Sequence, residues 1–242
     1  MIDTHCHVDL FPNPAAVVAA CERQALHTVA VTNLPSHYRL GLEHVAGCRY
    51  VHLALGFHPL ATERNRRREM ALFEEHASQA KYIGEVGLDL SPEGWRTRAE
   101  QEEVIRLVFS CLRGRRRFVT MHSRRGEEQV LDLLAEYEVG PVVLHWFSGP
   151  ARALERAIDD GHCFSVNPAM TASRRGVGLI ERMPPDRVLT ETDGPYVQLK
   201  NQPARPEEVR RVLDRLCGIW AVPWERAEEL VRRNFDRLTA DL

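Results

Sequence analysis

Short apolar runs rich in β-branched residues recur along the chain, and most are followed by a longer stretch with helical periodicity. Buried parallel strands read as near-continuous apolar segments, so these runs predict strands. The expected strands cover residues 1–7, 28–32, 51–56, 82–85, 118–122, 142–145, 163–166 and 188–192. Apolar residues recurring at i, i+3 and i+4 predict helices over residues 15–24, 70–79, 99–113, 127–137, 151–160 and 174–182.

Two further helices, over residues 206–217 and 223–238, are expected to begin with proline in their first turn. Eight strand–helix alternations in 242 residues predict the α/β class, with a single (β/α)8 TIM-barrel domain over residues 1–242. The structural alternative is a doubly wound open sheet, which usually carries a glycine-rich loop after its first strand. Residues 5–9 follow the first strand here and contain no glycine, which favours the barrel.

Ionisable side chains gather at the carboxyl ends of the predicted strands, where barrel enzymes carry their sites. His5 and His7 end the first strand, and their i, i+2 spacing points both imidazoles to one side. The same end of four further strands carries Glu85, His122, His145 and Asp193. Burying four histidines and two carboxylates together is costly without a partner. The sequence therefore predicts a shared metal centre.

Six ligating side chains exceed the needs of one ion, because a zinc site takes four ligands and a catalytic one keeps a position open. They fit two divalent cations joined by a bridging carboxylate. Glu85 is the expected bridge, because its strand lies between the first strand and those that carry His122 and His145. Mixed nitrogen and oxygen ligands are compatible with zinc, manganese or magnesium. Two-metal centres catalyse displacement at phosphorus, so phosphodiester hydrolysis is the expected chemistry.

The charged residues restrict how the protein can bind a phosphate-containing substrate. The net charge is −2, from 32 cations and 34 anions, which excludes a generally basic coat for nucleic acid but not a local phosphate site. All cations except Lys81 and Lys200 are arginines. The arginines of residues 113–117 precede the fifth strand and are expected at the end of the barrel opposite the metals. Those expected on or near the metal face are Arg64, Arg66, Arg67, Arg68, Arg124, Arg125, Arg174 and Arg175.

Cellular location is predicted from what the sequence lacks. No apolar run approaches the roughly 18 residues of a membrane span. The first residues show no signal-peptide pattern, and the six cysteines form no CxxC pair. A cytoplasmic protein with reduced thiols and no membrane contact is expected.

The polar segments also form motifs, namely residues 3–7 (DTHCH), 56–59 (GFHP), 83–89 (IGEVGLD), 122–124 (HSR), 145–149 (HWFSG) and 191–196 (ETDGPY). In this order they resemble the TatD-type deoxyribonuclease family of the amidohydrolase-like superfamily. The resemblance implies a metal-dependent barrel nuclease, often a 3′→5′ exonuclease, whose partner is DNA as single strands or 3′ ends.

The resemblance also implies roles for single residues. His5, His7 and Asp193 would hold one cation. His122 and His145 would hold the other, and Glu85 would bridge the two and share in catalysis. Asp193 would position the attacking water and accept its proton.

Some positions depart from the family pattern. Residues 90–96 (LSPEGWR) replace an aromatic pair and a basic residue, and the loop at 197–202 is short. Trp146 stands where cysteine is commoner, and Gly194 where serine is commoner. These features are similar to the TatD-like component of the Qat anti-phage defence operon, which implies a defence role and operon-encoded partners.

Three side chains near the metals are candidate substrate contacts. His58 is a candidate phosphate donor or leaving-group acid, with a supporting hydrogen bond as the alternative. Arg124 is a candidate phosphate clamp or a plain ion pair, and Trp146 either stacks on a terminal base or packs in the core. Glu191 is expected to orient a neighbouring ligand.

Two other functions were weighed. An amidohydrolase-type C–N bond hydrolase often bridges its metals with a carbamylated lysine on strand four, and neither Lys81 nor Lys200 occupies that position. A mononuclear deaminase is disfavoured by Glu85 at the end of that strand. The second alternative is a non-catalytic subunit of a defence complex, which is disfavoured because every expected ligand is present.

Overall fold

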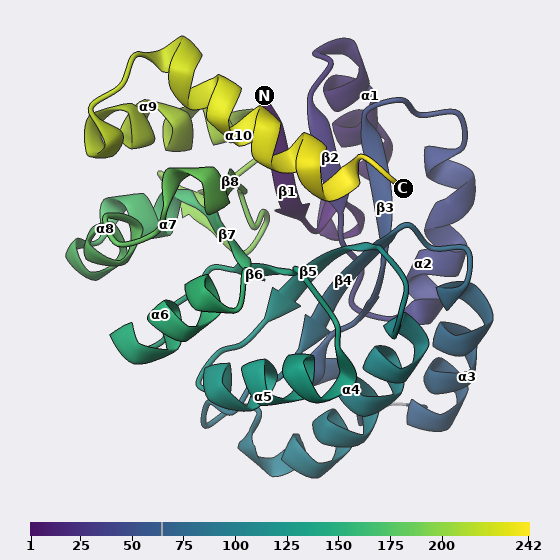
Figure 1. Ribbon diagram of the computed structural model, residues 1–242. Helices are drawn as coiled ribbons and strands as arrows, with labels where there is room; N and C mark the ends of the chain where they lie inside the picture. The colour runs from purple at the N-terminus through teal and green to yellow at the C-terminus, as the bar shows by residue number, and fades with distance from the viewer. Residues whose placement is uncertain (64) are drawn as a thin grey trace.

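The computed structural model describes residues 1–63 and 65–242, so Arg64, expected near the rim, lies outside the described residues. Eight parallel strands follow one another from β1 to β8, each paired with the next, which confirms the single-domain (β/α)8 barrel (Figure 1). The strands are β1 Ile2–Cys6, β2 His27–Ala30, β3 Val51–Phe57, β4 Tyr82–Gly87, β5 Phe118–His122, β6 Val143–His145, β7 Cys163–Val166 and β8 Val188–Thr190.

Helices surround these strands. Among the described residues they are α1 Pro14–Arg23, α2 Pro35–Gly41, α3 Arg66–Ala77, α4 Arg98–Leu112, α5 Glu127–Tyr137, α6 Ala151–Asp159, α7 Pro168–Ala172, α8 Arg174–Ile180, α9 Val209–Trp220 and α10 Trp224–Thr239. The sequence pattern missed α2 and α7, which have 7 and 5 residues and are too short to show a helical repeat.

The proline expectation was wrong only for α10, because Pro206 does lie in the first turn of a helical segment that runs directly into α9. Pro206 begins a short 3-10 turn, and α9 starts three residues later at Val209. Pro223 precedes α10 as its N-cap, with ψ at 159°, so the helix starts at Trp224. Proline has no N–H to donate, which suits it to a helix start on either side of the first residue.

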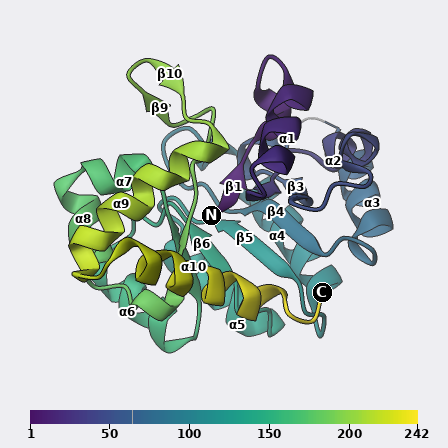
Figure 2. The same cartoon turned by 90° about the horizontal axis from the view of Figure 1, so that it is seen from above.

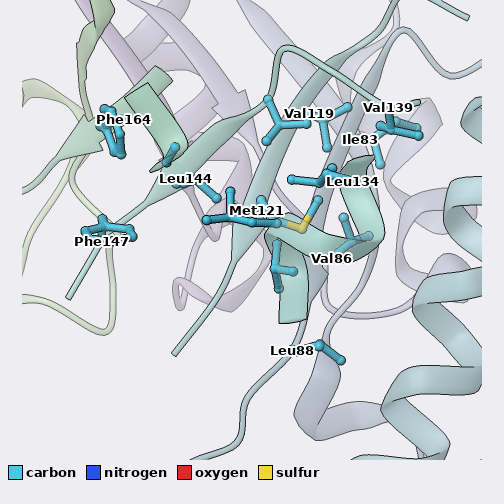
Figure 3. Packing of buried hydrophobic residues seen from close by; sticks show 14 of the residues in the cluster. Ile83, Val86, Leu88, Val119, Met121, Leu134, Val139, Leu144, Phe147 and Phe164 are labelled. Carbon is cyan, nitrogen blue, oxygen red and sulfur yellow. The ribbon is translucent and has the colours of Figure 1, made fainter. Parts of the chain in front are cut away.

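A continuous apolar layer lies between the strands and the helices. Strand register places Val86, Met121, Leu144 and Phe164 side by side on β4 to β7, and Figure 3 shows this row of side chains. All four are at most 1% exposed and belong to the main hydrophobic cluster, together with residues of α4 and α5. Because side chains alternate along a strand, neighbours of these residues point into the barrel.

Helix α10 closes the amino-terminal end of the barrel. It crosses in front of the strands in Figure 1, and Figure 2 shows it at the opposite end from the small hairpin β9 Gln198–Leu199 and β10 Gln202–Pro203. Val231 and Phe235 of α10 pack in one cluster with Ile2, Phe118 and Leu189 of the strands. The opposite, carboxyl end of the strands is left for the functional site.

The barrel is closed between β8 and β1. The backbone N–H of Asp193 donates to the His5 carbonyl over 2.9 Å, and the His7 N–H donates to the Gly194 carbonyl over 2.8 Å. The buried Asp3 carboxylate accepts from both the N–H and the hydroxyl of Thr192, over 3.0 and 2.5 Å. These bonds hold the end of β8 against the end of β1, where three of the expected ligands lie.

The described part of the chain contains no helix that is both long enough and apolar enough to cross a membrane.

Candidate metal centre

A bulge in β4 turns Glu85 into the barrel. Ile83 pairs with Val119 and Val86 with Met121, so β4 uses one more residue than β5 over this interval. The extra residue lets Ile83 and Val86 both face the helices while Glu85 faces inward. Gly84 permits this shape, because its φ is +149° and a Cβ there would lie 2.2 Å from the Thr120 methyl carbon.

The two oxygens of Glu85 face two separate groups of histidines. Oε2 lies 3.2 Å from His7 Nε2 and 3.5 Å from His5 Nε2. Oε1 lies 2.6 Å from His122 Nδ1 and 3.0 Å from His145 Nε2. The carboxylate therefore stands between the pair on β1 and the histidines of β5 and β6, as a bridging ligand would.

Asp193 joins the β1 histidines. Its Oδ1 lies 3.6 Å from His7 Nε2 and 3.8 Å from His5 Nε2, and all three side chains are buried. The bonds that close the barrel fix this group, because the backbone of Asp193 is held by the His5 carbonyl. The six side chains expected as ligands are thus brought together at one end of the barrel.

The donor atoms fit a cation. The Nε2 atoms of His5 and His7 are buried without a hydrogen-bond partner among the described residues. Buried polar atoms of this kind are normally satisfied. One atom each from His5, His7 and Asp193 lies within 4.8 Å of the others, and the same holds for His58, Glu85 and His122. Divalent cations would satisfy these donors.

Electrostatics also favour cation binding. Burial lowers the pKa of His5 to about 3, so its ring is neutral and keeps a lone pair for a metal. Burial raises the pKa of Asp193 well above its ordinary value, and the Glu85 carboxylate adds to the rise while His145 opposes it. Burial acts on Glu85 in the same sense, but His58, His145 and His122 outweigh it and lower its pKa well below the ordinary value.

Glu191 contacts His145 on the ring nitrogen that faces away from Glu85. It is fully buried, and it accepts hydrogen bonds from the Ser165 hydroxyl, from Asn167 Nδ2 over 3.1 Å and from the Trp146 N–H over 3.1 Å. Its Oε1 lies 3.5 Å from His145 Nδ1. This geometry aims His145 Nε2 at Glu85, as expected for a residue that orients a ligand.

Asp89 orients His122 in the same way that Glu191 orients His145. No role was predicted for Asp89 from the sequence. Its Oδ2 lies 3.0 Å from His122 Nε2, which leaves Nδ1 directed at Glu85. Burial opposes ionisation of Asp89, but hydrogen bonds from His122 and Ser91 prevail and lower its pKa to about 2. The available signal was its position at the end of the motif that also contains Glu85.

A cavity of about 530 Å³ opens over these residues, and His58, Arg124, Trp146 and Tyr196 all line it. His58 Nδ1 accepts from the Leu60 N–H over 3.1 Å, so its Nε2 carries the proton and points at Glu85 Oε1, 3.4 Å away. Trp146 is 36% exposed and Tyr196 is 57% exposed. Tyr196 was not singled out from the sequence, although it ends the last motif.

The departure at Gly194 has a local cause. A Cβ at this position would lie 1.9 Å from the carbonyl oxygen of Ala204, which returns from the β9–β10 hairpin. The short hairpin therefore leaves no room for a serine beside Asp193.

The family model described as TatD related DNase matches residues 2–240. The chain belongs to this family. It is similar to an uncharacterized metal-dependent hydrolase, YjjV, of Escherichia coli K12, with 28% identity over 96% of this chain and 95% of that protein. It is 26% identical to deoxyribonuclease TATDN3 of Homo sapiens, over 84% of this chain and 82% of that protein. This TatD-family chain is a metal-dependent hydrolase.

Solved structures agree with the fold. The crystal structure of YjjV aligns with a TM-score of 0.87 at 24% identity, covering 98% of this chain and 97% of that one. A TatD-family hydrolase from Entamoeba histolytica aligns with a TM-score of 0.83 at 16% identity, covering 98% and 97% of the two chains.

Proposed function

We propose that this chain is a deoxyribonuclease that hydrolyses phosphodiester bonds in single-stranded DNA or at 3′ ends, in the 3′→5′ direction, with two divalent cations. The observation that carries the proposal is Glu85, whose two oxygens face the β1 histidines on one side and His122 and His145 on the other. Family membership and the name of the human relative support DNA as the substrate.

His5, His7 and Asp193 would hold one cation, His122 and His145 the other, and Glu85 both. When bound, the two cations supply a water that ionises near neutral pH and neutralise charge on the phosphoryl oxygens. Zinc, manganese and magnesium all suit this ligand set.

The chain's own groups would do the remaining work. Asp193, buried beside His5 and His7, would orient the attacking water and accept its proton. His58 lines the cavity with its Nε2–H 3.4 Å from Glu85 Oε1, and this N–H would donate to a phosphate oxygen or to the leaving group. Arg124 would clamp a phosphate, and Trp146, exposed at the cavity wall, would stack on a terminal base.

A cytoplasmic location, a role in anti-phage defence and operon-encoded partners belong to the same proposal. They are supported by the sequence resemblance and by the substitutions at residues 90–96 and at Trp146.

Incubation of metal-loaded protein with 3′- and 5′-labelled single-stranded DNA tests the reaction. We expect a ladder that shortens from the 3′ end. Glu85→Ala and Asp193→Asn should each lower the rate by more than about 100-fold, because both remove a ligand shared with the reacting centre. Circular dichroism and metal content establish that each variant folds and how much metal it binds.

Asp132→Asn is the matched control, since Asp132 is an exposed carboxylate on α5 that pairs with Arg156. Full activity of Glu85→Ala or Asp193→Asn would contradict the proposed site. Release of ammonia from a nucleobase without a ladder would identify a deaminase, and no turnover with any of the three metals would indicate a binding subunit.

A further inference from the structure

Glu93 places a carboxylate in the wall of the cavity, and the proposed mechanism does not use it. It lies in the turn between β4 and α4 and is exposed, with 67% of its side-chain surface accessible. Its Oε2 accepts from Arg124 Nη1 over 3.0 Å. The proposed phosphate clamp is thus already occupied by an anion that belongs to the chain.

Arg124 has no competing cation beside it. Among the described residues it is the only arginine or lysine that lines the cavity, whereas Glu85, Asp89, Glu93 and Asp193 line it as carboxylates. Glu85 and Asp193 face the histidines, and Asp89 is buried and bonded to His122. Asp89 Oδ2 also lies 4.0 Å from Arg124 Nη1, but it is buried and held by His122. Of the two carboxylates that pair with Arg124, Glu93 is the exposed one, and it is the one that a phosphate on Arg124 would replace.

The turn that carries Glu93 is firmly held. Buried Gln101 of α4 accepts from the Asp89 N–H over 2.8 Å and donates to the Gly94 carbonyl over 2.8 Å. The Trp95 N–H donates to the Ser91 carbonyl over 2.9 Å. Because this backbone is held, the Glu93 carboxylate can leave Arg124 by rotation of its exposed side chain without a change in the turn.

We propose that Glu93 is a specificity-determining residue that competes with the phosphate of the substrate for Arg124. The inference rests on the proposed phosphodiesterase function. The Glu93 carboxylate occupies the place on Arg124 that a phosphate would take, and it has to rotate away when a phosphoester binds. This competition weakens the binding of anionic ligands. Substrates that present one phosphodiester are favoured over those with several phosphates at the cavity, because each added anion meets the displaced carboxylate.

Glu93→Gln in the metal-loaded protein tests this competition, with inorganic phosphate as the probe. We expect phosphate to bind about threefold to fivefold more tightly by calorimetry, the size of effect expected for loss of one exposed ion pair. The inhibition constant of phosphate against hydrolysis of bis(4-nitrophenyl) phosphate should fall by the same factor. In an Arg124→Gln background, Glu93→Gln should change neither value by more than about 1.5-fold.

Glu136→Gln is the matched control, because Glu136 is an exposed glutamate that pairs with Arg106 over 2.9 Å on the outer surface of α5. It should leave phosphate binding unchanged. Unchanged or weaker phosphate binding in Glu93→Gln would overturn the inference, since a residue that merely positions Arg124 gives weaker binding. Equal tightening in the Arg124→Gln background would also overturn it.

The two readouts separate this inference from the proposed function. If the wild type hydrolyses no phosphodiester but Glu93→Gln binds phosphate more tightly, the nuclease assignment is wrong and the role of Glu93 is supported. If the wild type degrades DNA but Glu93→Gln binds phosphate no more tightly, the nuclease assignment is supported and the role of Glu93 is wrong.

Discussion

At the scale of residues, the site is built from ligands and from the groups that orient them. Glu191 and Asp89 each contact one histidine on the ring nitrogen that faces away from Glu85. Because the outer contact sets which nitrogen keeps its lone pair, these carboxylates prepare the histidines for metal. The residues proposed as ligands could be selected from the sequence, since polar residues at strand ends stand out against apolar runs, and the structure places them side by side. The pairing of Asp89 with His122 was not, because it depends on side-chain geometry across two strands.

Glu191→Gln should weaken metal binding by about 10- to 100-fold, because the charge that orients His145 is lost. Titration with metal against a chelating dye measures this. A purely structural role would lower stability without changing metal affinity in the folded protein. Glu69→Gln is the control, because Glu69 is also buried and accepts from the Ser36 N–H over 2.9 Å, away from the histidines.

At the scale of elements, the sequence predicted all eight strands within a few residues and the alternation that makes a barrel. It failed where an element is too short for periodicity, as in α2 and α7. It also failed to anticipate the bulge at Gly84, because a β-bulge changes which face a residue occupies without changing the apolar pattern. That bulge decides that Glu85 points into the barrel rather than toward the helices.

Helix α10 should contribute to the stability of the protein by packing against the amino-terminal end of the barrel. Phe235 is 3% exposed, and its ring centroid lies 5.7 Å from that of Phe118. Phe235→Ala should lower the free energy of unfolding by about 3–5 kcal/mol through the cavity it leaves, as measured by urea denaturation. Arg233→Ala, on the exposed side of α10, should cost less than about 0.5 kcal/mol. A loss below about 1 kcal/mol in Phe235→Ala would mean that α10 does not seal the barrel.

At the scale of the whole molecule, the two ends of the barrel have different roles. The carboxyl end holds the cavity and the histidine cluster. Arg113 and Arg116, from the conspicuous arginine run, pair with Glu138 and Asp241 away from that cavity. Buried titratable groups also lie outside the site, and they make stability depend on pH.

His162, which precedes β7, is such a group. Burial lowers its pKa to about 4, and its Nδ1 accepts from the Val142 N–H over 3.3 Å. The unfolded chain takes up a proton near pH 6.5 while the folded one does not, so stability falls between pH 6.5 and 4. The loss from pH 7.5 to pH 5 should be about 2 kcal/mol.

Chelator-treated wild type and His162→Gln, unfolded in urea at both pH values, provide the comparison. Glutamine keeps an acceptor for Val142 but does not titrate. The difference in free energy of unfolding between the two proteins should therefore shift by that amount. Parallel pH profiles would show that His162 is protonated freely in the folded state.

The closure between β1 and β8 has a consequence for how the protein is made. His5 and His7 leave the ribosome before Asp193, which lies nearly two hundred residues further along the chain. Glu85, His122 and His145 become available in between. The group of His5, His7 and Asp193 forms only once the segment after β8 has docked against the end of β1. A cation can bind to this group only in a completed barrel, so hydrolytic activity begins only after folding has finished.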